Sequence, residues 1–187
     1  MATQDSRIKI KRSTVTATVP TVPSSNDHTD GTWIATDIYK GELFFNQADG
    51  VLWSRDDSGV ICLGGSASLT IASADVLTLN TTPLTIVPAA GVGTFIELIS
   101  ASVYIDFNTT PYATDKSLYL FQDTATESMA SNSNALGATS TVLSGFIKEE
   151  GANSLENTPV KVKSLTTDPT AGDSDITVFV KYRIILV

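Results

Sequence analysis

The feature that most constrains the fold is a succession of short apolar runs that fills the chain from residue 69 onward. Turn-forming Thr, Asn, Pro and Gly residues separate the runs, and period-two alternation within them predicts strands. Short strands at this spacing are typical of a β-sandwich or jelly roll, so we expect an all-β domain. The expected strands are Leu69–Ala72, Val76–Leu79, Leu84–Ile86, Thr94–Asp106, Lys116–Gln122, Leu143–Ile147, Pro159–Ser164 and Asp175–Leu186.

Two of these runs are long enough to form the centre of a sheet. The run 94–106 should bend or bulge near Ser100, and the clean alternation of 175–186 favours a central position. The sequence offers a single helix candidate, 123–136, which is rich in Ser and Asn. It lacks an apolar stripe with a 3.6-residue period, so we expect an exposed loop there.

Residues 41–65 predict a separate β-meander. Strands are expected at 41–46, 51–54 and 60–63, and the turns between them contain Asp-Gly and Asp-Ser-Gly, which suit tight hairpins. Three strands alone are not stable, so the meander must pack on something. The following segment, 64–68, is small and uncharged, and we interpret it as a flexible boundary between domains.

Large apolar and aromatic side chains gather in the meander. A ligand-binding aromatic platform, a small core and a subunit interface all use such residues, but no charged or amide groups are interspersed to orient a ligand. We therefore favour a small core or a subunit interface over a ligand platform, and we infer that three chains meet at an oligomer interface here. Its residues would be Phe44, Phe45, Leu52, Trp53 and Ile61.

Residues 1–30 predict an extended arm. Period-two patterning indicates a strand, which Pro20 and Pro23 interrupt. Ordering some thirty residues costs about 30–60 kcal/mol of backbone entropy, and the arm has few large apolar residues to offset this. It must be held by its own sheet, by sister subunits or by another protein, and we infer an assembly. The expected anchoring residues are Ile8, Ile10, Val15 and Val19.

Composition argues against several functional classes. A net charge of −8 disfavours nucleic-acid binding, although four of the twelve basic residues precede Ser13. No apolar run approaches the roughly 20 residues that span a bilayer, and the basic N-terminal segment is not followed by the apolar core of a signal peptide. We therefore expect synthesis in the cytoplasm and no membrane partner.

Catalytic and metal-binding signatures are also missing from the sequence. The single cysteine, Cys62, and the single histidine, His28, have no motif around them, so neither a nucleophilic pair nor a zinc site is expected. The turns Asp56-Asp57 and Asp173-Ser174-Asp175 lack the spacing of a calcium loop, and turn chemistry explains them. Loose carboxylates alone do not predict a glycosidase. These are Asp106, Asp115, Asp123, Glu149 and Glu150. We expect no enzyme, no cofactor and no metal.

Several of these segments resemble structural proteins of tailed bacteriophages. The meander, with Gly41-Glu42-Leu43, Asp49-Gly50 and Asp56-Asp57, is similar to short N-terminal attachment modules of phage fibre and other virion proteins. The later part resembles a β-domain of phage structural proteins. The resembling segments there are Leu77–Asn80, Pro88–Gly91, Asp106–Thr114, Pro169–Asp175 and Val178–Ile184. The resemblance implies a virion component without catalysis.

Together these observations predict three parts: an anchoring arm (1–30), a meander for attachment and trimerisation (31–65) and a β-sandwich (66–187). Because the chain has no long shaft, we expect a homotrimeric head fibre or capsid decoration protein on the exterior of a phage particle. Its partners would be itself and a capsid or sister fibre protein. The alternative is a tail or baseplate fibre that recognises a host-surface glycan through outer loops such as 124–136.

Overall fold

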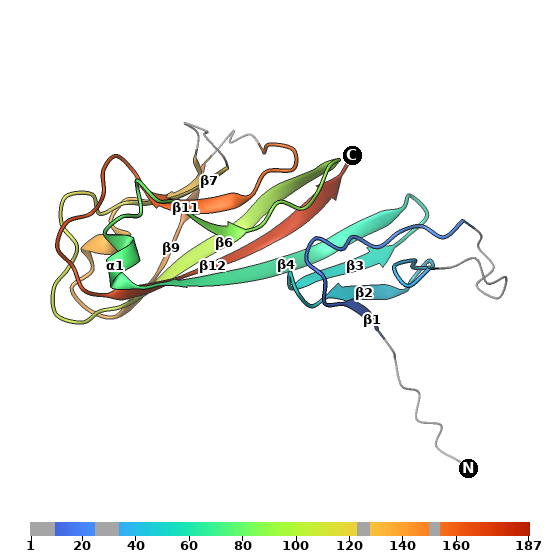
Figure 1. The fold of residues 1–187 in the computed structure, drawn as a ribbon, viewed down its shortest axis with the longest axis horizontal. Helices are drawn as coiled ribbons and strands as arrows, with labels where there is room; N and C mark the ends of the chain where they lie inside the picture. Colours follow the sequence, from blue (N-terminus) through green and yellow to red (C-terminus); the bar gives the residue numbers. More distant parts are fainter. Residues whose placement is uncertain (1–9, 25–33, 123–127, 150–153) are drawn as a thin grey trace, which may run out of the picture. The chain divides into compact units, whose positions relative to one another are not determined.

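The computed structural model describes residues 10–24, 34–122, 128–149 and 154–187. The chain divides into two compact units, Met1–Leu63 and Gly64–Val187, which we call the N-terminal and C-terminal units. Almost all regular structure in the described residues is β, which confirms the all-β prediction. Figure 1 shows the strands of both units.

The N-terminal unit contains the predicted meander with one strand added to its edge. The strand order is β1-β2-β3-β4, and β1 pairs in parallel with β2, while β2 and β3 form an antiparallel hairpin. The arm before the meander therefore joins the sheet of its own chain. The bounds are β1 Lys11–Ser13, β2 Leu43–Asn46, β3 Val51–Arg55 and β4 Val60–Ile71.

The C-terminal unit contains two sheets. The first has the order β4-β12-β6-β9 and uses the later residues of β4; the second has the order β10-β8-β7-β11-β5. The strands not yet given are β5 Leu84–Val87, β6 Thr94–Asp106, β7 Leu118–Gln122, β8 Ser128–Asn132, β9 Val142–Gly145, β10 Ile147–Lys148, β11 Val160–Ser164 and β12 Asp175–Leu186.

Each sheet of the C-terminal unit has one buried face. Along β12 the side chains at even positions from Ile176 to Ile184 are buried, and those at odd positions are exposed or half-buried. Along β11, Val160, Val162 and Ser164 are buried. In Figure 1, β7 and β11 lie along one side of β6 and β12. The two buried faces therefore pack together as a sandwich, as predicted.

The two long strands have the predicted bounds. β12 lies between β4 and β6, so its central position is confirmed. The register between β6 and β12 shifts where Ser100 pairs with Lys181 and Leu98 pairs with Tyr182. Ile99 is the extra residue on β6, which places a bulge next to the predicted position.

Five local expectations are wrong. Residues 64–68 are not a flexible linker, because all of them lie within β4. The expected strand at 76–79 is instead the end of helix α1 (Ser73–Val76) and the turn that follows, with Val76 and Leu79 fully buried. Residues 128–136 are not an exposed loop, since they form β8 and the start of the 3₁₀-helix η1 (Ala135–Gly137). Residues 123–127 lie outside the described part.

The fourth correction is that the single strand expected at Leu143–Ile147 is two strands, β9 and β10, which belong to different sheets. The fifth concerns the arm. Strand β1 covers only Lys11–Ser13, and the chain turns at residues 15–17 with Ala17 at a φ of 56°. Period-two alternation therefore does not continue to Val19. Val15 is 66% exposed because it lies in this turn and not in a strand with a buried face.

Candidate functional site

The strongest candidate binding surface is the exposed face of the sheet β4-β12-β6-β9, which we call the outer face. Antiparallel pairing aligns its side chains in rows: Lys181 lies between Ser66 and Ser100, and Phe179 lies between Ser68 and Ser102. The central part of the outer face consists of Ser66, Ser68, Thr70, Ser100, Ser102, Tyr104, Leu143, Gly145, Thr177, Phe179 and Lys181, and Asp106, Asp175 and Arg183 lie at its two ends.

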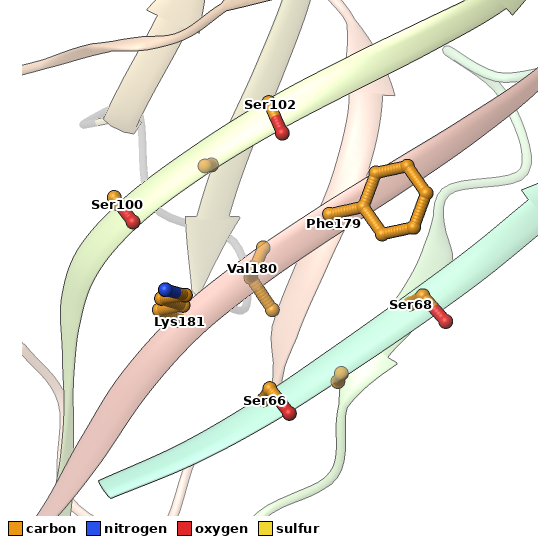
Figure 2. A pocket seen from close by; sticks show the side chains of 9 residues that line it. Ser66, Ser68, Ser100, Ser102, Phe179, Val180 and Lys181 are labelled. Atoms are coloured by element: carbon orange, nitrogen blue, oxygen red, sulfur yellow. The ribbon is translucent and has the colours of Figure 1, made fainter.

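The outer face is hollowed on both sides of β12. Figure 2 shows the side chains of Phe179 and Lys181 between the short serine side chains of β4 and β6. The hollow has a volume of about 370 Å³. Phe179 is 42% exposed, and further along the face Tyr104 is 37% exposed and Leu143 is 65% exposed. The surface therefore combines apolar side chains with a floor of small residues.

Apolar exposure on this scale is informative because the other face of the same sheet already fills the core. Tyr104 lies directly opposite Leu143, and Phe179 lies diagonally to Tyr104 through the pair it makes with Ser102. Exposed apolar clusters on a folded domain mark contact surfaces more often than isolated apolar residues do. The geometry suits contact with another macromolecular surface.

The acidic residues of the C-terminal unit hold turns. Asp173 accepts hydrogen bonds from the backbone N–H groups of Thr109 and Thr110 and from the Thr109 hydroxyl. Asp115 accepts from the backbone of Thr166 at 2.5 Å. Each carboxylate thereby ties together two segments that are far apart in the sequence.

These hydrogen bonds lower the pKa values of the carboxyl groups. The Thr109 hydroxyl and then the neighbouring N–H groups lower the pKa of Asp173, and the Thr81 N–H does the same for Asp168. For Asp115, burial raises the pKa, but hydrogen bonds from Thr166, Ser117 and Thr167 outweigh burial and lower it overall. In each case the charged form is favoured in the folded state.

We expect acid to destabilise the C-terminal unit for this reason. A carboxyl group whose pKa is lower in the folded state stabilises the fold at pH values above its unfolded pKa of about 3.9. That stabilisation is lost as the pH falls through the folded value. Thermal unfolding followed from pH 7 to pH 2.5 should show a falling midpoint below about pH 4.

Asp115→Asn should flatten this pH dependence, because an amide does not titrate in this range. Asp57→Asn is a suitable control, since Asp57 is exposed and pairs with Lys40 in the N-terminal unit. A midpoint that stays constant from pH 7 to pH 2.5 would contradict the role assigned to these carboxylates.

In the N-terminal unit, two polar side chains hold the arm: the buried Asn46 and the half-buried Asp49. Asn46 is 1% exposed, and its Nδ2 donates to the backbone oxygens of Val15 and Thr18, each at 3.2 Å. Asp49 accepts from the backbone N–H of Ala17 at 2.7 Å. The turn of the arm is therefore fixed by the first hairpin of the meander.

A second set of contacts holds the arm further along. Lys11 donates to Glu42 and to the backbone oxygen of Asp37, and Asp37 accepts from the Thr21 hydroxyl at 2.6 Å. The Thr21 hydrogen bond is the largest of the influences that lower the pKa of Asp37. For residues 10–24, the alternative that the arm is held by its own sheet is the one observed.

Asn46→Ala should release the arm without unfolding the meander. The substitution leaves the Val15 and Thr18 carbonyl groups without this donor, at a cost of about 1–3 kcal/mol. Hydrogen exchange at Ala17 should accelerate by about tenfold or more, since 1.4 kcal/mol corresponds to a factor of ten. Gln47→Ala is the matched control, because Gln47 is exposed and its backbone bond to Ser13 is retained. Unchanged hydrogen exchange at Ala17 in Asn46→Ala would contradict the role of Asn46 in holding the arm.

The predicted interface residues do not share one face of the meander. Phe44 pairs with Trp53 and both are 1% exposed, whereas Phe45 pairs with Leu52 and both are half-buried. They therefore do not form one exposed patch, because neighbouring residues in a strand point to opposite faces. Ile61 is 36% exposed. Their role in an oligomer stays a prediction.

The predicted anchoring residues are also dispersed. Ile10 is 46% exposed and Val15 is 66% exposed, while Val19 is half-buried. Ile8 lies outside the described residues. Whether these side chains anchor the protein to a partner stays a prediction, and the exposed pair remains available for such a contact.

Residues considered for chemistry are not brought together. Within the described ranges no three His, Cys, Asp or Glu residues form a group that could hold a metal ion. Asp56 accepts from Ser58 and Gly59 of its own turn, which is the turn chemistry expected. Cys62 is half-buried. His28, Asp123 and Glu150 lie outside the described residues.

The sequence analysis predicted neither the outer face nor the hydrogen bonds between Asn46 and the arm. A signal for the outer face is present in the sequence, because Ser-Ala-Ser occurs at 66–68 and again at 100–102. In a strand this pattern places small polar residues on one face and alanine on the other. The hydrogen bonds of Asn46 have no comparable signal in the sequence, since they depend on how the arm folds back onto the meander.

Comparisons with known proteins give one similarity. No family model matches the sequence, and no curated protein matches it. A chain of the capsid asymmetric unit of cyanophage Pam1 is similar in structure, with a TM-score of 0.44 and 17% identity. The similarity covers 65% of this chain and 84% of that chain. At this level it carries no conclusion about function. In the described part of the chain, no helix is long and apolar enough to cross a bilayer.

Proposed function

We propose that this protein is a non-enzymatic structural component of a bacteriophage particle, which works by binding other virion proteins. In its finer form the proposal is a homotrimeric head fibre or capsid decoration protein on the particle exterior. The N-terminal region anchors it and the C-terminal β-domain is exposed. The resemblance of the meander and of the later turns to phage virion proteins supports this class.

The observation that carries the proposal is the outer face. A sheet face with exposed Phe179, Tyr104 and Leu143 above small residues is suited to protein contact. Two of the carboxylates considered for catalysis have structural partners, because Asp115 holds a turn and Glu149 accepts a hydrogen bond from the Ser131 hydroxyl. A binding role therefore explains more of the described surface than an enzymatic role does.

The alternative is a tail fibre that binds a host glycan through the loop 124–136, of which the structure describes 128–136. Residues 128–136 form β8 and part of η1, and Met129 and Leu136 are buried. A glycan site needs exposed side chains at a loop surface, so this segment does not support it. We therefore adopt the capsid-associated role.

Mass spectrometry of purified particles of the phage that encodes this protein tests the role directly. The heads and tails should be separated first, and the protein is expected in the head fraction. Presence in the tail fraction would favour the receptor-binding alternative. Absence from both fractions would overturn the virion role.

The trimer is tested separately, through the exposed side of the meander. Phe45→Asp should lower the oligomer mass measured by sedimentation, because it places a charge among half-buried apolar residues. Near-UV and far-UV circular dichroism should remain unchanged, since the core residue Phe44 is retained. Ser54→Asp is a suitable control, because Ser54 is half-buried but polar. An unchanged oligomer mass in Phe45→Asp would contradict this interface.

A further inference from the structure

The charges at the two ends of the outer face have opposite signs. At one end Asp175 pairs with Asp106 across β12 and β6, and Asp173 lies beside them around an acidic hollow. Toward the other end lie Lys181 and then Arg183, which pairs with Glu97. Within the described residues, no ion pair involves Lys181 or the acidic group.

Between these ends the outer face is uncharged. The row of Phe179, Ser68 and Ser102 is followed by the row of Thr177, Thr70 and Tyr104. The charged ends are related by position along β12, because Asp175 and Lys181 are equally far from Val178. Consider a two-fold axis that is parallel to the plane of the sheet, perpendicular to the strands, and level with Val178. Rotation about this axis would place Asp175 of one copy opposite Lys181 of the other.

We propose that the outer face binds the outer face of a second copy of this chain around such a two-fold axis. Lys181 of each copy would then meet Asp175 and Asp106 of the other, at both ends of the contact. Isologous interfaces of this kind require a surface that is complementary to itself, and the charge pattern of the outer face meets that requirement.

The apolar side chains fit the same arrangement. The axis at Val178 places Phe179 of one copy over the row of Thr177 and Tyr104 of the other. The hollow in Figure 2, between the serines beside Phe179, would then receive Thr177 of the other copy. Stacked sheets keep their strands within about 30° of each other, so the long β12 strands of the two copies would run antiparallel across the contact.

The size of the contact sets its expected strength. Seven residues of β12, from 175 to 181, span about 23 Å, and four strands span about 19 Å, which gives a projected area of about 450 Å². Stable interfaces bury about 800 Å² on each partner. We therefore expect association only at high protein concentration, or where copies are held close together on a larger assembly.

This contact is separate from the proposed three-fold contact of the meander, and the two are distinguishable by mass. Sedimentation of the full chain should show a doubling of the oligomer mass as its concentration rises to about 0.5 mM, the range expected for a small interface. Doubling of a monomer would mean that the trimer proposal fails and the pairing holds. A species that never doubles would overturn the pairing, whether that species is a monomer or a trimer.

Charge reversal tests the arrangement of the two copies. Lys181→Asp and Asp106→Lys should each weaken the doubling about tenfold or more, because each places like charges opposite one another. The double variant should recover part of the doubling, because the carboxylate at 181 then meets a lysine at 106 of the other copy, while Asp175 is retained. Lys161→Asp is the matched control, because Lys161 lies on β11 in the other sheet. If the double variant recovers none of the doubling of the oligomer mass, while circular dichroism shows an intact fold, the two-fold arrangement is overturned.

Discussion

Gly172→Ala should destabilise the C-terminal unit by about 2–4 kcal/mol, a large share of the stability of an ordinary domain. Gly172 has a φ of +87°, where an L-residue is strained. A Cβ at this position would also overlap the ring of Tyr112. The ring has no room to move away, because Tyr112 is 1% exposed and its hydroxyl donates to the backbone oxygen of Ser174 at 2.6 Å.

Burial of the Tyr112 ring raises the pKa of its hydroxyl, so this hydrogen bond is retained across the whole neutral range. The expected loss should appear as a lower midpoint in urea unfolding. Gly41→Ala is the matched control, because Gly41 has a similar φ of +78° but no atom within 4 Å of the added methyl group. Equal destabilisation by both substitutions would show that backbone strain alone acts at Gly172.

A double-mutant cycle separates the steric part. Tyr112→Leu removes the ring that the added Cβ would meet, so Gly172→Ala should cost less in that background than in the natural chain. A coupling energy near zero would contradict the explanation that the two side chains collide.

Trp53→Ala should destabilise the N-terminal unit by about 3–5 kcal/mol, because it empties the largest buried side-chain volume of the meander. Trp53 pairs with Phe44 on the face that also buries Val51 and Arg55. The segment around Ile38 accepts a hydrogen bond from Arg55 at 3.1 Å, which connects that segment to β3.

Limited proteolysis with identification of the fragments measures this effect. Trp53→Ala should expose cleavage sites before residue 64 and leave the C-terminal unit intact. Leu52→Ala is the control, since Leu52 is the neighbouring residue on the opposite, half-exposed face and should cost less. If the two variants were cleaved equally fast, the meander would not have a buried face specific to Trp53.

Much of the fold was predictable because strand periodicity is a local property. The bounds of β6 and β12 and the bulge near Ser100 follow from alternation of apolar residues within single segments. The expectation failed where pairing with a distant strand decides the conformation. Residues 64–68 contain the composition of a linker, yet β12 holds part of this segment in register, with Gly65 opposite Tyr182.

Gly65 shows why composition misled here. An added Cβ would lie 2.8 Å from the Tyr182 ring, so glycine is required for this ring to pack over the neighbouring strand. An aromatic side chain that covers a cross-strand glycine compensates for the poor strand propensity of glycine. Tyr182 lies more than 100 residues away in the sequence, so no window around residue 65 contains this information.

The candidate site was harder to predict than the fold. The aromatic residues of the meander indicated an interface, but Phe44 and Trp53 are buried in the core of their own unit. The outer face contains few large residues, and its character depends on the alignment of three strands that are distant in the sequence. Which residues face solvent together is decided by register, which composition does not report.

The antiparallel pairing of β4 and β12 has a mechanical consequence. Gly65 pairs with Tyr182 at one end of the ladder, and Ile71 pairs with Ile176 at the other, so the first residue of the C-terminal unit and Val187 lie near the same end. A force that pulls Gly64 and Val187 apart would break the hydrogen bonds between β4 and β12 one pair at a time, starting at that end. A force applied between Val187 and helix α1, which follows β4, would instead load the whole ladder in shear. The unit should therefore resist tension far better when it is held near α1 than when it is held at Gly64.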